Sequence, residues 1–363
     1  MKLDRLPKEN TLQGLLLLQD AWRDYDVATY LASSNKITFK ILFFLQILFG
    51  YLAIAGATLA EYFKRVDLVS EIGDQFEEVV FFLSLLVSLL GAIDALTQCK
   101  SKWRLLRSSA HGLESMLWQY RTRVGPFEII ETMRDSEGPE NELCKMLNEW
   151  RDNLLAGANL KMSSLHQAYP ARVYKHFQDS GQPTGPTEDD FQSPVQPHRY
   201  IKLRIEPALK FYQDRIPQYA RYSFILQTSS LLLGIGATVL AYYKYLSIVV
   251  MCTSAAGAVT TWVEFSDVTR KMERYTDVVN GLRKILSWWK VQSAVQKASK
   301  ETISALIQSS EAMLSEERSA WMSVAESKKD QAGQSEEEGG TKQTRANLRP
   351  SKGKGTKVAP GDD

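Results

Sequence analysis

The chain has 363 residues, of which 44% are hydrophobic and 24% are charged, and 44 basic residues balance 42 acidic ones. A net charge of +2 excludes a strongly basic nucleic-acid binder held by whole-chain electrostatics. The three cysteines, Cys99, Cys144 and Cys252, lie far apart, which excludes a disulfide scaffold and a closed zinc site and favours a reducing setting. These averages resemble a soluble globular protein, but charged and apolar residues are segregated along the chain.

Four windows of the sequence carry no charge: residues 41–60, 79–93, 222–243 and 245–263. A helix needs about 20 mainly apolar residues to cross a bilayer, because each residue rises about 1.5 Å across a core of about 30 Å. Three windows reach that length, and the second reaches it by including Asp94. The alternative is a buried helix of a large soluble bundle, which rarely stays uncharged beyond about 14 residues. We therefore predict an all-α membrane protein with spans at about 40–61, 79–97, 222–243 and 245–264.

The charges that flank these windows predict the topology. The first outer loop is acidic, and the second carries only Lys244. Basic residues flank the other ends of the spans: Lys36, Lys40, Lys100, Lys102, Arg104, Arg107, Arg215, Arg221, Arg270, Lys271 and Arg274. The positive-inside bias therefore predicts an integral multi-pass protein with both termini in the cytosol.

The two pairs of spans resemble each other. Residues 40–62 laid on 221–243 without gaps share eight identities in twenty-three, including the polar pair Gln46 and Gln227. Each second span is followed by basic residues and a Gly-Leu-x-x-x-Leu run, at 112–117 and 281–286. We predict two repeated two-span helical hairpins with long cytosolic helical extensions.

The domain plan follows from this repeat. We expect hairpin domains at 1–123 and 200–324, with a cytosolic insert at 124–199 between them. The insert contains one amphipathic helix, at 140–155, and a Pro-rich linker, at 181–198. Stripes of apolar residues at helical spacing predict long cytosolic helices with coiled-coil-like packing. A polar tail, 325–363, is disordered by composition, and its bases could contact anionic headgroups.

Charged residues recur where each hairpin enters the membrane. The two ends of a hairpin lie at the same face, so Lys40 is expected to approach Asp94, and Arg221 to approach Glu264 or Asp267. Such pairs either neutralise themselves at the interface or belong to an ion path. Small residues four apart predict close helix packing. These residues are Gly56, Ala60, Gly234, Thr238, Ser254 and Ala258.

No catalytic motif is present in the sequence. The four histidines stand apart from any cysteine or carboxylate at metal-ligand spacing, and there is no P-loop, G-x-G-x-x-G or G-x-S-x-G. We therefore expect no enzymatic activity, no cofactor and no metal.

The second hairpin carries a recognisable pattern of residues. It begins with Tyr200, Arg204 and Pro207, continues with the aromatic pair Phe211 and Tyr212, and ends with Arg274-Tyr275 and Gly281-Leu282. Residues 200–289 resemble the SLATT superfamily, the two-transmembrane effector domains associated with SMODS and SLOG sensors. Residues 12–120 are similar to a weaker second copy, in which Trp22 and Tyr25 replace the aromatic pair and the Tyr-x-x-x-Arg element is absent.

The resemblance implies a pore-forming or membrane-perturbing effector that responds to a sensor of a nucleotide-derived signal. No sensor domain accompanies the hairpins, so such a sensor would act in trans or belong to a missing portion of a longer gene product. We expect a homo-oligomer in a lipid bilayer, without nucleic acid as a partner. The alternative is a non-conducting membrane scaffold that recruits cytosolic partners through its helices and tail.

Overall fold

The computed structural model describes residues 10–64, 70–128, 138–158, 167–176 and 189–315. Helices and turns account for these ranges, and no strand occurs in them. The predicted all-α class is therefore confirmed. The predicted disordered tail, 325–363, and part of the Pro-rich linker lie outside the described residues. The described helices all belong to one compact unit, Met1–Arg318.

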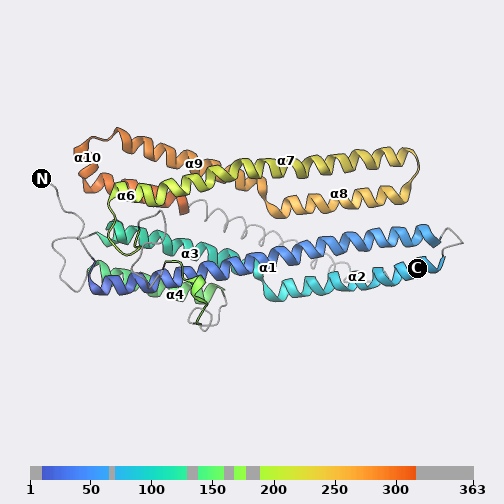
Figure 1. Ribbon diagram of the computed structural model, residues 1–363, viewed down its shortest axis with the longest axis horizontal. Coiled ribbons are helices and arrows are strands. Elements are labelled where there is room, and N and C mark those ends of the chain that lie inside the picture. The colour runs from blue at the N-terminus through green and yellow to red at the C-terminus, as the bar shows by residue number, and fades with distance from the viewer. Residues whose placement is uncertain (1–9, 65–69, 129–137, 159–166, 177–188, 316–363) are drawn as a thin grey trace, which may run out of the picture. The chain divides into compact units, whose positions relative to one another are not determined.

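The first hairpin consists of α1 (Leu12–Lys64) and α2 (Ser70–Thr97), which lie side by side in Figure 1. At about 1.5 Å per residue, the 53 residues of α1 extend about 80 Å, so one unbroken helix forms both a span and its extramembrane continuation. The two helices approach closely at Gly56, where an added Cβ would lie 2.9 Å from Val80 Cγ2. Glycine is needed here because any side chain would push the helices apart.

The second hairpin begins with α6 (Pro197–Tyr200) and a π-helical turn, η5 (Ile201–Ile205). Pro207 has no N–H to donate to the preceding turn, and the helix passes this point with the wider π spacing before it resumes as α7 (Glu206–Tyr242). A turn with Lys244 at φ 63° leads into α8 (Leu246–Ser266). Buried Ala237, the counterpart of Gly56 in the repeat alignment, lies within α7.

Four helical stretches of the described chain are long and apolar enough to cross a membrane. They contain the four predicted spans, which are confirmed as candidate transmembrane helices. Few side chains of these windows are buried within the chain. On α2 the exposed face carries large apolar residues such as Phe81, Phe82, Leu85 and Leu89, which suit a lipid environment.

Both hairpins leave the membrane through the same backbone turn. Gln98 and Asp267 have the left-handed φ of 49°, and each donates its N–H to the carbonyl four residues earlier. The extramembrane helices α3 (Cys99–Thr122) and α9 (Val268–Val291) begin directly after these turns. Fifteen residues beyond Gln98 and Asp267, Leu113 and Leu282 are fully buried. The two hairpins therefore follow one backbone plan.

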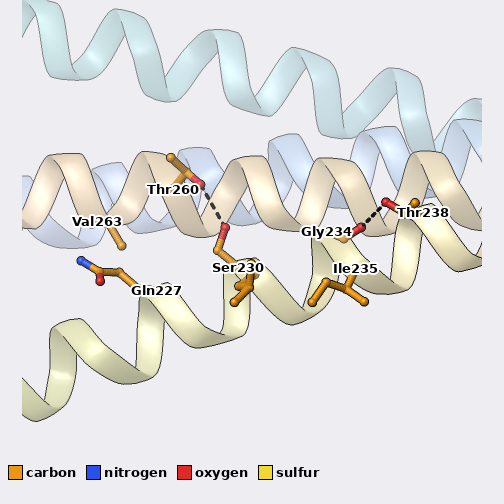
Figure 2. Close-up of a pocket in the computed structure, with 8 residues that line it drawn as sticks. Gln227, Ser230, Gly234, Ile235, Thr238, Thr260 and Val263 are labelled. Carbon is orange, nitrogen blue, oxygen red and sulfur yellow. Dashed lines mark hydrogen bonds between the residues drawn. The ribbon is translucent and has the colours of Figure 1, made fainter.

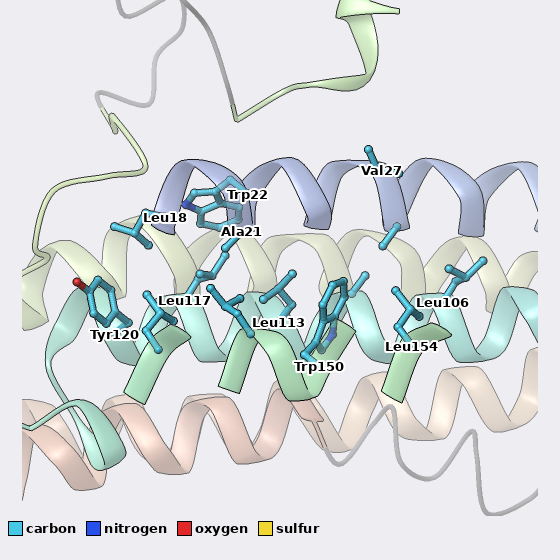
Figure 3. Close-up of a cluster of buried hydrophobic side chains, with 14 of the residues drawn as sticks. Leu18, Ala21, Trp22, Val27, Leu106, Leu113, Leu117, Tyr120, Trp150 and Leu154 are labelled. Atoms are coloured by element: carbon cyan, nitrogen blue, oxygen red, sulfur yellow. The ribbon is translucent and has the colours of Figure 1, made fainter. Parts of the chain in front are cut away.

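Two hydrophobic cores lie outside the spans. The first joins α1, α3 and α4 (Pro139–Ala158), with Trp22, Leu113 and Trp150 at its centre, as Figure 3 shows. The second joins the start of α7 to α9 and to the helical residues 300–315, beyond α10 (Ala294–Ala298). Trp118 and Val124, which follow the first hairpin, pack in this second core. The extramembrane parts of both hairpins are therefore joined through α3.

Candidate functional site

The membrane-spanning part of α8 exposes small and polar residues. Between Thr253 and Glu264, the exposed positions are Thr253, Gly257, Thr260, Thr261 and Glu264. With 3.6 residues per turn they share one face, opposite Trp262. No large apolar side chain is exposed in this part of α8, whereas α2 exposes several. This part of α8 thus differs from α2, although α7 of the same hairpin also exposes large apolar residues such as Phe224, Leu231 and Leu232.

This polar face borders a groove of about 650 Å³ between α7 and α8, shown in Figure 2. Gln227, Ser230, Gly234 and Thr238 line it from α7, and Thr260 lines it from α8. Ser230 and Thr260 share a hydrogen bond of 3.3 Å between their hydroxyl oxygens, which holds the two helices together across the groove. The Thr238 hydroxyl donates to the carbonyl of Gly234 at 3.0 Å. The groove therefore carries hydroxyl groups and an amide among mostly apolar walls, which include Leu231, Ile235 and Val263.

The opposite face of α8 contacts the first hairpin through aromatic rings. Phe265 stacks on Phe43 with ring centroids 3.7 Å apart and lies 4.8 Å from Phe39. The Trp262 ring lies 5.9 Å from Phe44. These rings fix α8 against α1, so the polar face of α8 points away from the first hairpin.

The predicted interface charges lie at these helix ends without forming the predicted pairs. In the described part of the chain, no ion pair joins Lys40 to Asp94, or Arg221 to Glu264 or Asp267. Asp267 instead contacts Arg274 at 3.3 Å and Arg270 at 3.8 Å, both on the helix that it precedes. The left-handed turn at Asp267 directs its carboxylate toward α9. The role of these five residues stays a prediction.

The predicted packing residues fall into two groups. Gly56 and Ala60 are buried on α1, where α2 approaches. Gly234 and Thr238 are exposed, and an added Cβ on Gly234 would meet no atom within 4 Å. Ser254 and Ala258 of α8 are half-buried. Within this chain, α7 therefore leaves its small residues uncovered beside the groove.

The residues that carried the family resemblance meet in a buried network. The Tyr200 hydroxyl donates to Glu311 Oε1 at 2.9 Å, and Arg204 Nε donates to the same oxygen at 3.1 Å. A second nitrogen of Arg204 pairs with Glu114 of α3. Glu311 is 1% exposed at its side chain, and Tyr200 is fully buried. This network joins α7, the helical residues 300–315 and α3.

Burial and the Glu311 carboxylate raise the pKa of Tyr200 well above its ordinary value, so its hydroxyl stays a donor. Burial disfavours the charged form of Arg204, but Glu114 and Glu311 outweigh it and raise the pKa of Arg204. The guanidinium is therefore a permanent cation between two carboxylates. Such a network can hold helices together.

The aromatic pair of the motif supports a neighbouring cluster. Phe211 and Tyr212 pack near Tyr275 of α9, with the Tyr212 and Tyr275 ring centroids 4.9 Å apart. Pro207 lies at the start of α7, about two turns after the buried Tyr200. Phe211 and Tyr212 thus face the junction of α7 and α9, and Pro207 belongs to the helix start that leads to it.

Sequence reasoning missed Glu114, Glu311 and Trp118. Trp118 lies edge-on to Tyr200, with ring centroids 5.8 Å apart. One feature of the sequence could have identified the two glutamates: each is an acidic residue within an apolar helical stripe. A carboxylate at such a position is costly to bury unless a basic residue pairs with it. Nothing in the sequence identified the partner, because Glu311 lies 107 residues from Arg204.

Within the described ranges, no three His, Cys, Asp or Glu side chains gather into a cluster that could hold a metal ion. His176 lies 2.6 Å from Asp26 and stacks on Trp22, and His111 lies 3.1 Å from Glu114. These two histidines therefore belong to packing contacts of the extramembrane helices.

Two family models match the chain. Residues 200–321 match the family described as "SMODS and SLOG-associating 2TM effector domain 1", and residues 23–134 match one described as "Protein of unknown function (DUF4231)". No curated protein and no solved structure matches. The fold and its apolar helices define a multi-pass membrane protein built from helical hairpins.

Residues 200–321 are therefore similar to the two-transmembrane effector domains of this family. The match extends past residue 289, where the sequence resemblance ended, and so includes the helix that carries Glu311. The first hairpin matches a separate family, so its origin as a second SLATT copy stays a prediction.

Proposed function

We propose that the protein is an oligomeric membrane effector in which α8 and the adjoining groove line a water-filled pore. The observation that carries this proposal is the exposed stripe of Thr253, Gly257, Thr260 and Thr261. Small residues permit close approach of a neighbouring helix, and hydroxyl groups tolerate water. The large apolar side chains that α2 exposes support a position of the first hairpin at the outside of such an assembly.

The charge at the end of this stripe suggests the selectivity of the pore. Glu264 is exposed on the same face, one turn beyond Thr260. In an oligomer, copies of Glu264 would form a ring of carboxylates, which favours cations over anions. We expect Glu264→Gln to lower the cation preference of the current without removing the current.

The orientation and control of the pore are also part of the proposal. The positive-inside bias supports both termini in the cytosol, with the extramembrane helices on that side. The effector family supports control by a cytosolic partner that senses a nucleotide-derived signal. The role proposed for the protein is not enzymatic.

Release of a trapped dye from liposomes tests the pore. Purified protein is reconstituted at increasing protein-to-lipid ratio, and release is compared for wild type, Thr260→Leu and Ser88→Leu. Ser88 is an exposed serine on the lipid-suited face of α2, so the two variants make the same kind of change on opposite hairpins. We expect wild type and Ser88→Leu to release dye and Thr260→Leu to release at least several-fold less. Equal release by the two variants would overturn the assignment of α8.

The second candidate is a non-conducting scaffold. It is favoured by the extent of the two extramembrane cores, which provide more structure than a pore requires. A scaffold would release no dye under any trigger. The same liposome assay therefore separates the two functions.

A further inference from the structure

Basic side chains from four helices converge where the spans meet the extramembrane helices. Phe39 of α1 marks this level. The Lys100 ammonium at the start of α3 lies 5.4 Å from the Phe39 ring, and Phe265 at the end of α8 lies 4.8 Å from it. The ends of α2 and α8 therefore both reach α1 at this point.

Contacts on either side of Phe39 bring cations from different helices together. Lys36 lies 5.6 Å from the Trp103 ring of α3, and Arg107, one turn further along α3, acts on its charge. Arg104 of α3 is acted on by Asp267, which also acts on Lys271. Lys271 of α9 donates to the carbonyl of Ser266, next to the ring that touches Phe39. Arg215 lies over the Phe211 ring, 3.5 Å from its centroid, on the part of α7 that packs against α9.

These cations act on one another. Burial, then Lys40, Arg107 and Arg215, lower the pKa of Lys36. Burial and Lys40 lower the pKa of Lys271 to about 8, although Asp267 opposes this shift. The charged groups are thus close enough to repel in a partly desolvated place.

Asp267 supplies counter-charge to part of this group of cations. Asp267 is the carboxylate that acts on Lys271 and Arg104, and it also pairs with Arg270 and Arg274. Arg104 Nε is buried and has no hydrogen-bond partner in the structure. A buried donor of this kind costs free energy unless something outside the chain accepts its hydrogen bond.

We propose that Lys36, Lys40, Arg104, Arg107, Arg215 and Lys271, here called the basic cluster, bind a phosphate group, supplied by the headgroup of an anionic phospholipid. Arginine and lysine donors match phosphate oxygens, and an anion would offset the repulsion among the cations. The cluster lies at the ends of the spans, which is the depth of lipid headgroups. At an anionic leaflet each base near the surface is worth about 1 kcal/mol. This site does not depend on the proposed pore.

The test compares two double variants of the full-length protein in neutral detergent. Lys36→Gln/Lys271→Gln removes two charges from the cluster. Lys284→Gln/Lys290→Gln removes two exposed charges from α9, the helix that also carries Lys271, and these lie about 20–28 Å further along it. The unfolding temperature is measured with added phosphatidylglycerol, phosphatidylcholine or inorganic pyrophosphate, and retained lipid is measured by native mass spectrometry.

We expect phosphatidylglycerol, and not phosphatidylcholine, to raise the unfolding temperature of wild type and of the α9 control. The cluster variant should lose at least half of this shift and retain less lipid. A shift with pyrophosphate but not with phosphatidylglycerol would overturn the lipid source and support a soluble phosphate ligand. Equal phosphatidylglycerol shifts in the two double variants would overturn the site.

A measurement without ligand guards against misfolding of the cluster variant. Lys36→Gln/Lys271→Gln removes charges that repel one another. The unfolding temperature of this variant in neutral detergent should therefore equal or exceed that of wild type. A lower value would contradict the repulsion on which the site rests.

Discussion

Arg204 is held by two carboxylates that come from different parts of the chain. Glu311 belongs to the segment that matches the effector family, and Glu114 belongs to α3 of the first hairpin. Because all three groups are largely buried, the free energy of the network depends on complete pairing. A single residue therefore links this matched segment to the rest of the described chain.

Removing one carboxylate from this network measures how much the pairing with Arg204 contributes to stability. Glu311→Gln leaves Arg204 with one carboxylate and should lower the free energy of unfolding by about 3–5 kcal/mol. Glu301→Gln, an exposed position in the same helical stretch, should change it by less than about 0.5 kcal/mol. Unfolding midpoints of the two variants in detergent check the difference, and equal midpoints would contradict the network.

A second network joins Glu140 to Arg123 and Tyr120, and its contribution to stability depends on pH through Glu140. Burial raises the pKa of Glu140, but Arg123 and hydrogen bonds from Arg123 and Tyr120 outweigh burial and leave the pKa below its usual 4.5. A carboxylate with a depressed folded pKa stabilises the folded state above its unfolded pKa and loses that contribution as pH falls through the folded value. Glu140→Gln should therefore unfold at a lower temperature than wild type at pH 7, with the gap closing below about pH 4.5. Thermal unfolding at pH 7 and pH 3.5 measures this gap, and a constant gap would refute the assignment.

At the scale of helices, the four candidate spans could be predicted from composition. The uncharged windows fixed the four candidate spans, because lipid and length leave few alternatives. The partner of Arg204 and the contact between α1 and α8 could not be predicted, since apolar and charged groups do not identify partners distant in sequence. The interface ion pairs were placed by hairpin geometry alone, and the turn at Asp267 directs that carboxylate elsewhere.

The turn at Gln98 offers a test of the shared backbone plan. A non-glycine residue in the left-handed region costs about 1 kcal/mol, and Gln98 makes no capping hydrogen bond with its side chain. Gln98→Gly should therefore raise the unfolding temperature. Asp267→Gly should raise it less or lower it, because Asp267 also loses contacts with Arg270 and Arg274. Thermal unfolding of the two variants measures this difference. A higher unfolding temperature for Asp267→Gly than for Gln98→Gly would contradict the roles given to the two turn residues.

Packing of the first hairpin depends on Gly56. Gly56→Val should destabilise the α1–α2 pair by about 1–3 kcal/mol, because its Cβ would meet Val80 at 2.9 Å. Gly50→Val is the matched control on α1, since an added Cβ there meets nothing within 4 Å. Resistance to unfolding in detergent compares them, and equal resistance would show that α1 and α2 do not pack at Gly56.

At the scale of the whole molecule, the two hairpins are alike in backbone and different in surface. The first presents large apolar side chains along α2, and the second presents hydroxyls and glycine along part of α8 beside exposed apolar side chains of α7. The proposed pore would turn the first hairpin toward lipid and this part of α8 toward the axis. The near-neutral total charge conceals a separation of charges along the chain. Basic residues gather at one end of the spans, and acidic residues gather in the loop between the first two spans.

Accessibility of α8 to water tests the pore most directly. Single cysteines are placed at Thr260 and, as the control, at Leu85 of α2, after Cys99, Cys144 and Cys252 are replaced by serine. Under the conditions that release dye from liposomes, a membrane-impermeant thiol reagent should modify Thr260→Cys and not Leu85→Cys. Failure to modify Thr260→Cys while dye is released would contradict the proposal that α8 lines the pore.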